Sequence, residues 1–185
     1  MKVTPSTYQL KDGRSAVIRQ AQESDAEQML KMARQCASET RNLCSTESEY
    51  DLPVEAEIKW IIDRNGEGCL LQVVEVDGEL KGNCMTYPQG GRLRVRHRCG
   101  VGIGLLKEIW GNGIGTLMMQ NAIDFAKEYG YEQMELDVVA TNEAAVHLYE
   151  KLGFVRYCLQ PHAFRYEDGS YADLLLMALD LRKHI

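Results

Sequence analysis

The chain of 185 residues has a formal net charge of −6 and is 45% hydrophobic and 26% charged, as ordinary globular proteins are. This acidic balance, with no tract of Lys and Arg, excludes the usual electrostatic binder of nucleic acid. No apolar run approaches the roughly 18 residues of a membrane span, and the first ten residues lack the pattern of a signal peptide. Six scattered cysteines without a C-x-x-C pair predict reduced thiols and a cytoplasmic protein.

Residues 1–66 read as one strand followed by two helices. Residues 15–21 have the composition of a strand, and Ser24 with Glu27 three residues later forms the capping-box pattern of a helix start. A polar loop follows over residues 38–52. Pro53 suits the first turn of a second helix, which we expect to end at Gly66.

A strand hairpin and a glycine-led helix come next. Residues 69–76 and 80–87 flank Asp77-Gly78, a strong hairpin signal. A longer strand is expected over residues 93–106, including the basic run 92–98, whose alternation with apolar residues predicts one wet face. Behind "WGNGIG", apolar residues recur at helical spacing until Gly130, which ends that helix.

The last third alternates strand, helix and two strands. Residues 133–141 place Met134, Leu136 and Val138 on a buried face, opposite Glu135, Asp137 and Val139. Asn142 caps a short helix that ends at Gly153, and residues 154–159 and 171–181 form two closing strands. The order predicts a single α/β domain over residues 1–185, with a mixed sheet of about seven strands flanked by about four helices.

The cluster "WGNGIG" holds Gly111, Gly113 and Gly115 at a strand-to-helix junction. The first N–H groups of a helix lack partners and attract anions, and glycine lets an anion approach the backbone closely. The spacing matches neither the nucleoside-triphosphate loop nor the dinucleotide fingerprint, and no helical pattern follows "GVGIGLL" at 100–106. On its own the cluster fits an anion site or a tight turn equally well.

A second motif follows the next strand, in "VVATNEAAVHLYEKLGF" at 138–154. The pattern N-x-x-A-x-x-L-Y-x-x-x-G-F is matched in full by Asn142, Ala145, Leu148, Tyr149, Gly153 and Phe154. Here the chain resembles the GNAT superfamily of acetyl-CoA-dependent N-acetyltransferases, which implies a splayed sheet. The resemblance covers about residues 15–181, with the motifs at 98–154, and residues 162–181 look like the closing hairpin of the ribosomal-protein N-terminal acetyltransferase branch and its uncharacterised relatives.

The resemblance implies acetyl-CoA as co-substrate. No metal is expected, because His97 and His162 have no Cys or His neighbours at metal-ligand spacing. In the family pattern [Q/R]-x-x-G-x-[G/A], Trp110 takes the Gln/Arg position, while the two glycines match. Pantetheine would lie beside the strand that ends at Leu105 and Leu106, where a backbone N–H would hold the thioester oxygen. The remaining cofactor-binding residues implied are Gly111, Asn112, Gly113, Ile114, Gly115 and Thr116 for pyrophosphate, with Asn142 and Ala145 near pantetheine.

Acyl transfer needs an acid and a base. The resemblance makes Tyr149 the acid, the alternative being a tyrosine packed between helix and sheet. Asp137, twelve residues earlier, takes the place of a glutamate base, or is a solvated strand residue. Glu57 and Glu49 are rival carboxylates that could instead hold an ammonium group of the acceptor.

The predicted function is transfer of an acetyl group from acetyl-CoA to a primary amine by direct attack in a ternary complex. The amine belongs to a small molecule or a protein N-terminus, and the acidic residues at 47–57 favour a cationic acceptor. The alternative is a non-catalytic acyl-CoA-binding or sensor domain. Dimers are frequent in the superfamily, so a homodimer is expected.

Overall fold

The computed structural model describes residues 4–182 and contains one eight-stranded sheet in the order β1-β2-β3-β4-β5-β6-β8-β7. Its strands are β1 Ser6–Gln9, β2 Ser15–Gln20, β3 Leu70–Val76, β4 Glu79–Pro88, β5 Arg98–Leu105, β6 Gln133–Val139, β7 Val155–Arg165 and β8 Tyr171–Asp180. Its helices are α1 Ala26–Glu39, α2 Val54–Arg64, α3 Ile114–Tyr129 and α4 Glu143–Lys151. The mixed α/β fold and the four helices predicted from the sequence are confirmed.

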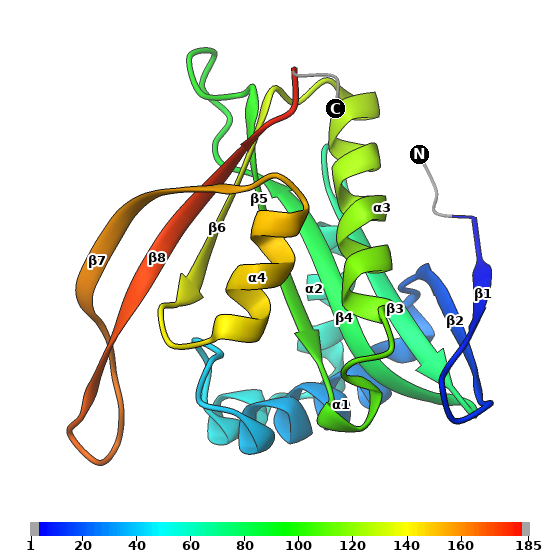
Figure 1. Ribbon diagram of the computed structural model, residues 1–185. Helices are drawn as coiled ribbons and strands as arrows, with labels where there is room; N and C mark the ends of the chain where they lie inside the picture. The colour runs from blue at the N-terminus through cyan, green and yellow to red at the C-terminus, as the bar shows by residue number, and fades with distance from the viewer. Residues whose placement is uncertain (1–3, 183–185) are drawn as a thin grey trace.

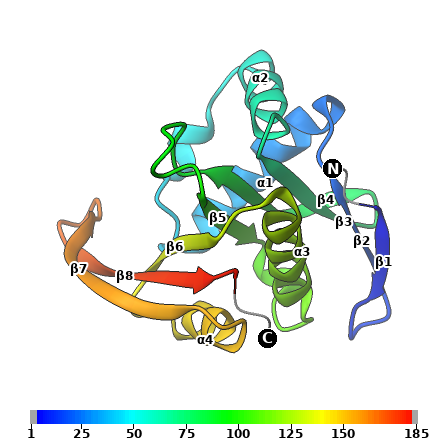
Figure 2. The ribbon, with the colours of Figure 1, turned by 90° about the horizontal axis from the view of Figure 1, so that it is seen from above.

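The helices cover both faces of the sheet, as Figures 1 and 2 show: α1 and α2 lie on one face, α3 and α4 on the other. Two apolar cores follow from this arrangement. The larger one joins α3 and α4 to the sheet through residues such as Met118, Phe125 and Met134. The smaller one joins α1 and α2 to the opposite face through Met29, Ile61 and Leu71.

Strands β5 and β6 form the parallel pair of this sheet, and they separate early. They pair at three positions, Arg98 with Gln133, Cys99 with Met134 and Gly100 with Glu135. Beyond that point β5 continues to Leu105, paired only with β4, while β6 continues to Val139, paired only with β8. The splay implied by the family resemblance is therefore present, and it leaves backbone groups of both strands facing a gap.

The predicted number of strands is close, and one strand boundary is wrong. The sheet has eight strands where about seven were predicted; the additional one is the short edge strand β1, which has too few residues to show a period and pairs with β2. The expected strand 93–106 begins only at Arg98, since residues 92–97 form a turn in which Arg96 N–H donates to the Arg92 carbonyl. Leu93 is 77% exposed in that turn, so the alternation there does not mark a strand face.

Two local predictions are also corrected. The capping box before α1 is made by Gln22 and Asp25, not by Ser24 and Glu27, because Arg19 holds the buried Asp25 carboxylate at 2.7 Å. Glu135 was expected on a wet face but is buried, and Arg98 and Gln133 bind its carboxylate. Val139, expected beside it on that face, is buried as well.

Candidate active site

The glycine loop and the start of α3 form a surface of unpaired backbone donors. Gly111 and Gly113 have φ values of 71° and 81°, which only glycine adopts without strain, and Gly113 is the N-cap of α3. The first intrahelical bond runs from Leu117 N–H to the Gly113 carbonyl, so the N–H groups at 114–116 lack helical partners. The Asn112 side chain holds the loop by accepting a bond from Lys11 N–H at 2.9 Å.

The backbone of β5 decides which N–H group faces the gap. Leu106 N–H donates to the Lys81 carbonyl on the β4 side at 2.9 Å, which leaves that group engaged. Because backbone groups alternate sides along a strand, the N–H of Leu105 points the other way, into the gap with β6. The Leu105 carbonyl accepts a bond from the Trp110 indole at 2.7 Å, so Trp110 fixes this end of the strand.

Helix α4 brings Tyr149 to the gap from the α3 and α4 side. The Asn142 side chain caps α4 by accepting a bond from Ala145 N–H at 3.4 Å. Tyr149 is 8% exposed, and its ring lies 5.9 Å from that of Phe154. Burial raises the pKa of Tyr149, and within residues 4–182 its hydroxyl makes no hydrogen bond. The phenol is therefore a protonated group with a free donor.

Asp137 reaches the same gap from the opposite face. It is exposed, two residues beyond the last β5–β6 pair, whereas its neighbours Leu136 and Val138 are buried under α3 and α4. Side chains alternate faces along a strand, so Asp137 lies on the face covered by α1 and α2. Asp137 thus lies on the face of the sheet opposite to α4, the helix that carries Tyr149.

A row of glycines along β5 shapes the side of the site that faces α1 and α2. The sequence alone did not predict this role for the glycines. Gly100, Gly102 and Gly104 alternate along the strand and leave this face without side chains. Any Cβ at position 100 would lie 2.6 Å from the Tyr87 ring, and one at position 102 would lie 3.3 Å from Met85. The glycines let these β4 side chains lean across β5, and the alternation in "GVGIG" was the available signal.

Helix α2 supplies the wall above this floor. Glu57 is half-buried without a charged partner within residues 4–182, and burial raises the pKa of its carboxyl. Trp60 and Arg64 lie one and two turns further along the same face of the helix. Glu49 lies apart from them, in a short turn where it accepts a bond from Thr46 N–H at 2.7 Å that lowers its pKa.

A family model described as the Acetyltransferase (GNAT) family matches residues 27–154 of this chain. Because that match covers more than half of the sequence, the chain belongs to the GNAT acetyltransferase family. The activity class predicted from the motifs, N-acetyl transfer with acetyl-CoA as co-substrate, is thereby confirmed.

Curated relatives agree with this family. An N-alpha-acetyltransferase of Sulfurisphaera tokodaii is 35% identical over 117 residues, which are 59% of this chain and 68% of the relative. N-alpha-acetyltransferase 30 of Schizosaccharomyces pombe is 40% identical over 55 residues, 30% of this chain and 37% of that protein.

Solved structures share the fold. A GNAT-family acetyltransferase from Streptococcus pneumoniae superposes with a TM-score of 0.84 at 28% identity, covering 89% of this chain and 99% of that one. The acetyltransferase yncA of Salmonella typhimurium, solved with acetyl-CoA, gives a TM-score of 0.80 at 20% identity, over 92% and 96% of the two chains. In the described part of this chain no helix is long and apolar enough to span a membrane, and no cluster of three metal-ligating side chains occurs.

Proposed function

We propose that this chain acetylates an amine by direct attack on the thioester, with Tyr149 as the acid and Asp137 as the base. One arrangement carries the proposal: Asp137 lies on β6 just beyond its last pair with β5, on the face of the sheet opposite to α4, which carries the buried Tyr149. Pantetheine lies beside β5 in this opening, next to Asn142 and Ala145 at the start of α4. The Leu105 N–H holds the thioester oxygen as it gains charge.

The reaction moves two protons. The amine nitrogen bonds to the thioester carbon and gives up a proton to the Asp137 carboxylate, directly or through a water. The carbon–sulphur bond breaks, and Tyr149 protonates the departing thiolate. The half-buried Glu57, and the more distant Glu49, orient the acceptor amine. Each proton transfer of this kind contributes roughly 10²–10⁴-fold in rate.

The pyrophosphate of acetyl-CoA binds at the N-terminus of α3. The unpartnered N–H groups of Ile114, Gly115 and Thr116, together with those of Gly111, Asn112 and Gly113, support this placement. The absence of side chains at Gly111 and Gly113, where a Cβ would meet nothing within 4 Å, keeps the surface open to an anion.

Two further parts of the proposal concern the cell. We place the protein in the cytoplasm, which its six free cysteines support. We also propose a homodimer, supported by the exposed apolar residues of the edge strand β7: Val155, Tyr157 and Leu159.

Calorimetric titration with acetyl-CoA tests the site, with Gly113→Ala compared against Gly130→Ala. Gly113 caps the start of α3 and Gly130 caps its end, with φ values of 81° and 99°. Both substitutions therefore strain the backbone similarly. Only Gly113 lies at the expected pyrophosphate, so we expect acetyl-CoA affinity to fall at least tenfold in Gly113→Ala and to stay unchanged in Gly130→Ala. Equal losses in the two variants would contradict the placement.

Release of free thiol in the presence of amines tests the turnover. Amine-dependent release by the wild type supports an enzyme. Tight acetyl-CoA binding without release for any amine would favour the sensor alternative.

A further inference from the structure

The guanidinium group of Arg64 lies in the acceptor wall without an acidic partner. Its Cζ atom is 5.7 Å from the centre of the Trp60 ring and 5.3 Å from that of Tyr87. It is half-buried, yet within the described part of the chain it makes no ion pair. Arg19, the comparable half-buried arginine of β2, holds both Asp25 and Glu75. Arg64 therefore keeps its charge uncompensated beside the site.

Two aromatic rings hold this arginine in place without using its hydrogen-bond donors. Cation–π contacts satisfy the charge partly and restrict the side chain, while the N–H groups at the edge of the guanidinium stay free. A planar guanidinium fixed in this way is suited to a bidentate bond with a carboxylate. The available donors thus point to an anionic group on the molecule that enters the acceptor site.

The position of Tyr87 connects Arg64 to the reacting groups. Its ring covers Gly100, the last β5 residue paired with β6, and Asp137 follows two residues beyond the partner of Gly100. The Asp137 charge raises the pKa of the Tyr87 hydroxyl, which burial raises most, and the Arg64 charge lowers it. Tyr87 therefore contacts Arg64 on one side and covers the start of the β5–β6 opening on the other.

We propose that Arg64 binds a carboxylate of the acceptor, and that the acceptor is a small amino carboxylate whose amine faces Asp137 and whose apolar part packs on Trp60 and Tyr87. The inference rests on the proposed function, because it names the acceptor of the same site. A compact acceptor suits this arrangement, because a single side chain, Tyr87, connects the Arg64 guanidinium to the strand position where the β5–β6 opening begins.

Kinetics with paired acceptors test the proposal. The probes are the standard free amino acids and their carboxamides, which differ only in the charge at the carboxyl group. For the wild type we expect the free acid to exceed its amide at least tenfold in kcat/KM, mostly through KM. In Arg64→Gln this ratio should fall at least tenfold, mainly through a higher KM for the free acid. Arg182→Gln, which removes an exposed arginine paired with Asp180, is the matched control and should keep the wild-type ratio.

Calorimetric binding of the same acids and amides to the protein saturated with CoA keeps the test independent of turnover. The inference is overturned, while the proposed function stands, if amides or peptides are acetylated as well as free acids. It is also overturned if the ratio of kcat/KM between acid and amide is unchanged in Arg64→Gln. If acids bind in an Arg64-dependent way but no amine is acetylated, the inference stands and the proposed function is overturned. If free acids are neither acetylated nor bound, the inference is overturned.

Discussion

At the scale of single residues, the division of labour between Tyr149 and Asp137 follows from their surroundings. Tyr149 is buried beside Phe154, and burial raises its pKa, so its proton is retained. Asp137 is exposed on the other face, where an amine can approach it. An acid kept protonated and a carboxylate kept accessible are the two groups that acyl transfer to an amine needs.

Replacing Tyr149 by Phe should lower kcat about 100-fold with acetyl-CoA affinity unchanged, because only the transfer of a proton to sulphur is lost. Because the pKa of Tyr149 is raised above its ordinary value of 10.0, kcat should not fall through loss of this proton below pH 10. Steady-state kinetics from pH 6 to 10 measure both effects.

Tyr131→Phe is the matched control, since this buried tyrosine donates to the Gly68 carbonyl at 2.9 Å. Loss of this hydroxyl and its hydrogen bond should lower the melting temperature but leave kcat unchanged. A Tyr149→Phe enzyme with wild-type kcat would remove Tyr149 from the mechanism.

At the scale of elements, the fork between β5 and β6 is held by one buried charge pair. Arg98, at the first paired position of β5, donates to both carboxylate oxygens of Glu135, which stands at the last paired position of β6. The hydrogen bonds from Arg98 lower the pKa of Glu135. The Glu135 side chain is 8% exposed and the Arg98 side chain 36%. The opening for acetyl-CoA therefore begins at a fixed point.

Arg98→Met should destabilise the fold by about 3 kcal/mol at pH 7, because it leaves the Glu135 charge buried and unpaired. This value is at the low end of the range for broken buried ion pairs, since Arg98 is partly exposed. The lowered pKa of Glu135 means that the pair stabilises the wild type above about pH 4.5 and loses this effect as pH falls through the folded pKa. The difference between wild type and variant should therefore shrink towards pH 4.

Urea denaturation at pH 7 and pH 4 measures the two free energies of unfolding. The double variant Arg98→Met/Glu135→Gln, which removes the stranded charge, should recover much of the loss. A variant as stable as the wild type at pH 7 would show that the pair does not hold the fork.

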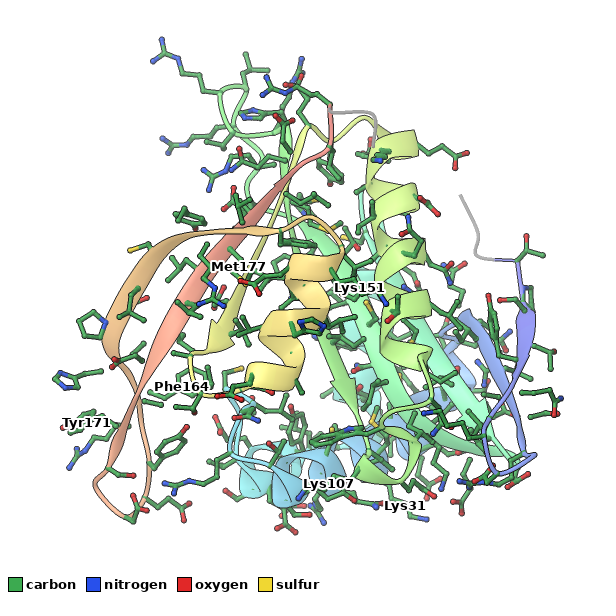
Figure 3. The ribbon with its side chains drawn as sticks, viewed as in Figure 1. Lys31, Lys107, Lys151, Phe164, Tyr171 and Met177 are labelled. Carbon is green, nitrogen blue, oxygen red and sulfur yellow. The ribbon has the colours of Figure 1, made fainter. Side chains whose placement is uncertain are left out.

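At the scale of the whole molecule, an arm formed by the far halves of β7 and β8 contacts the loop after α1. The far halves of β7 and β8 extend away from the helices, with Phe164 and Tyr171 on them (Figure 3). The tip returns to the loop after α1, where Arg41 pairs with Asp168 at 3.0 Å and lies 3.8 Å over the Tyr166 ring. Segments about 125 residues apart in the sequence are thus joined at the tip of the arm.

Arg41→Ala should release this arm and raise the acceptor KM severalfold, with acetyl-CoA affinity unchanged, because Arg41 is not among the residues of the proposed acetyl-CoA site. An exposed ion pair contributes about 0–1 kcal/mol, so the melting temperature should barely move. Hydrogen exchange at 160–174 should accelerate in this variant, and Arg34→Ala, which breaks the exposed pair with Asp51, should leave it unchanged. Equal exchange in both variants would mean that the arm is rigid without Arg41.

The sequence was sufficient wherever the signal is local. Asn142 as a cap, Gly130 as a helix end and Asp77-Gly78 as a turn are all present, since each depends on neighbouring backbone groups. The periodicity of α3 likewise predicts its buried face. The roles of the site residues in the chemistry stay proposals, although the structure brings most of them to one opening.

The failures share a cause. Glu135 looks like a surface residue until Arg98, 37 positions earlier, is placed beside it. The basic run at 92–97 has the alternation of a strand but no neighbouring strand to pair with. Arg64 and Tyr87 are ordinary residues in the sequence and become a pair only where α2 crosses the end of β4.

The sequence by itself determined the family, the order of elements from β2 onwards and the loop that presents bare backbone at the start of α3, because these depend on local pattern and glycine chemistry. The tertiary structure decided where β5 and β6 part, that Leu105 rather than Leu106 offers its N–H to the gap, and that an unpaired arginine lines the acceptor wall. Those features depend on strand register and on contacts between distant segments, which no short window of sequence encodes.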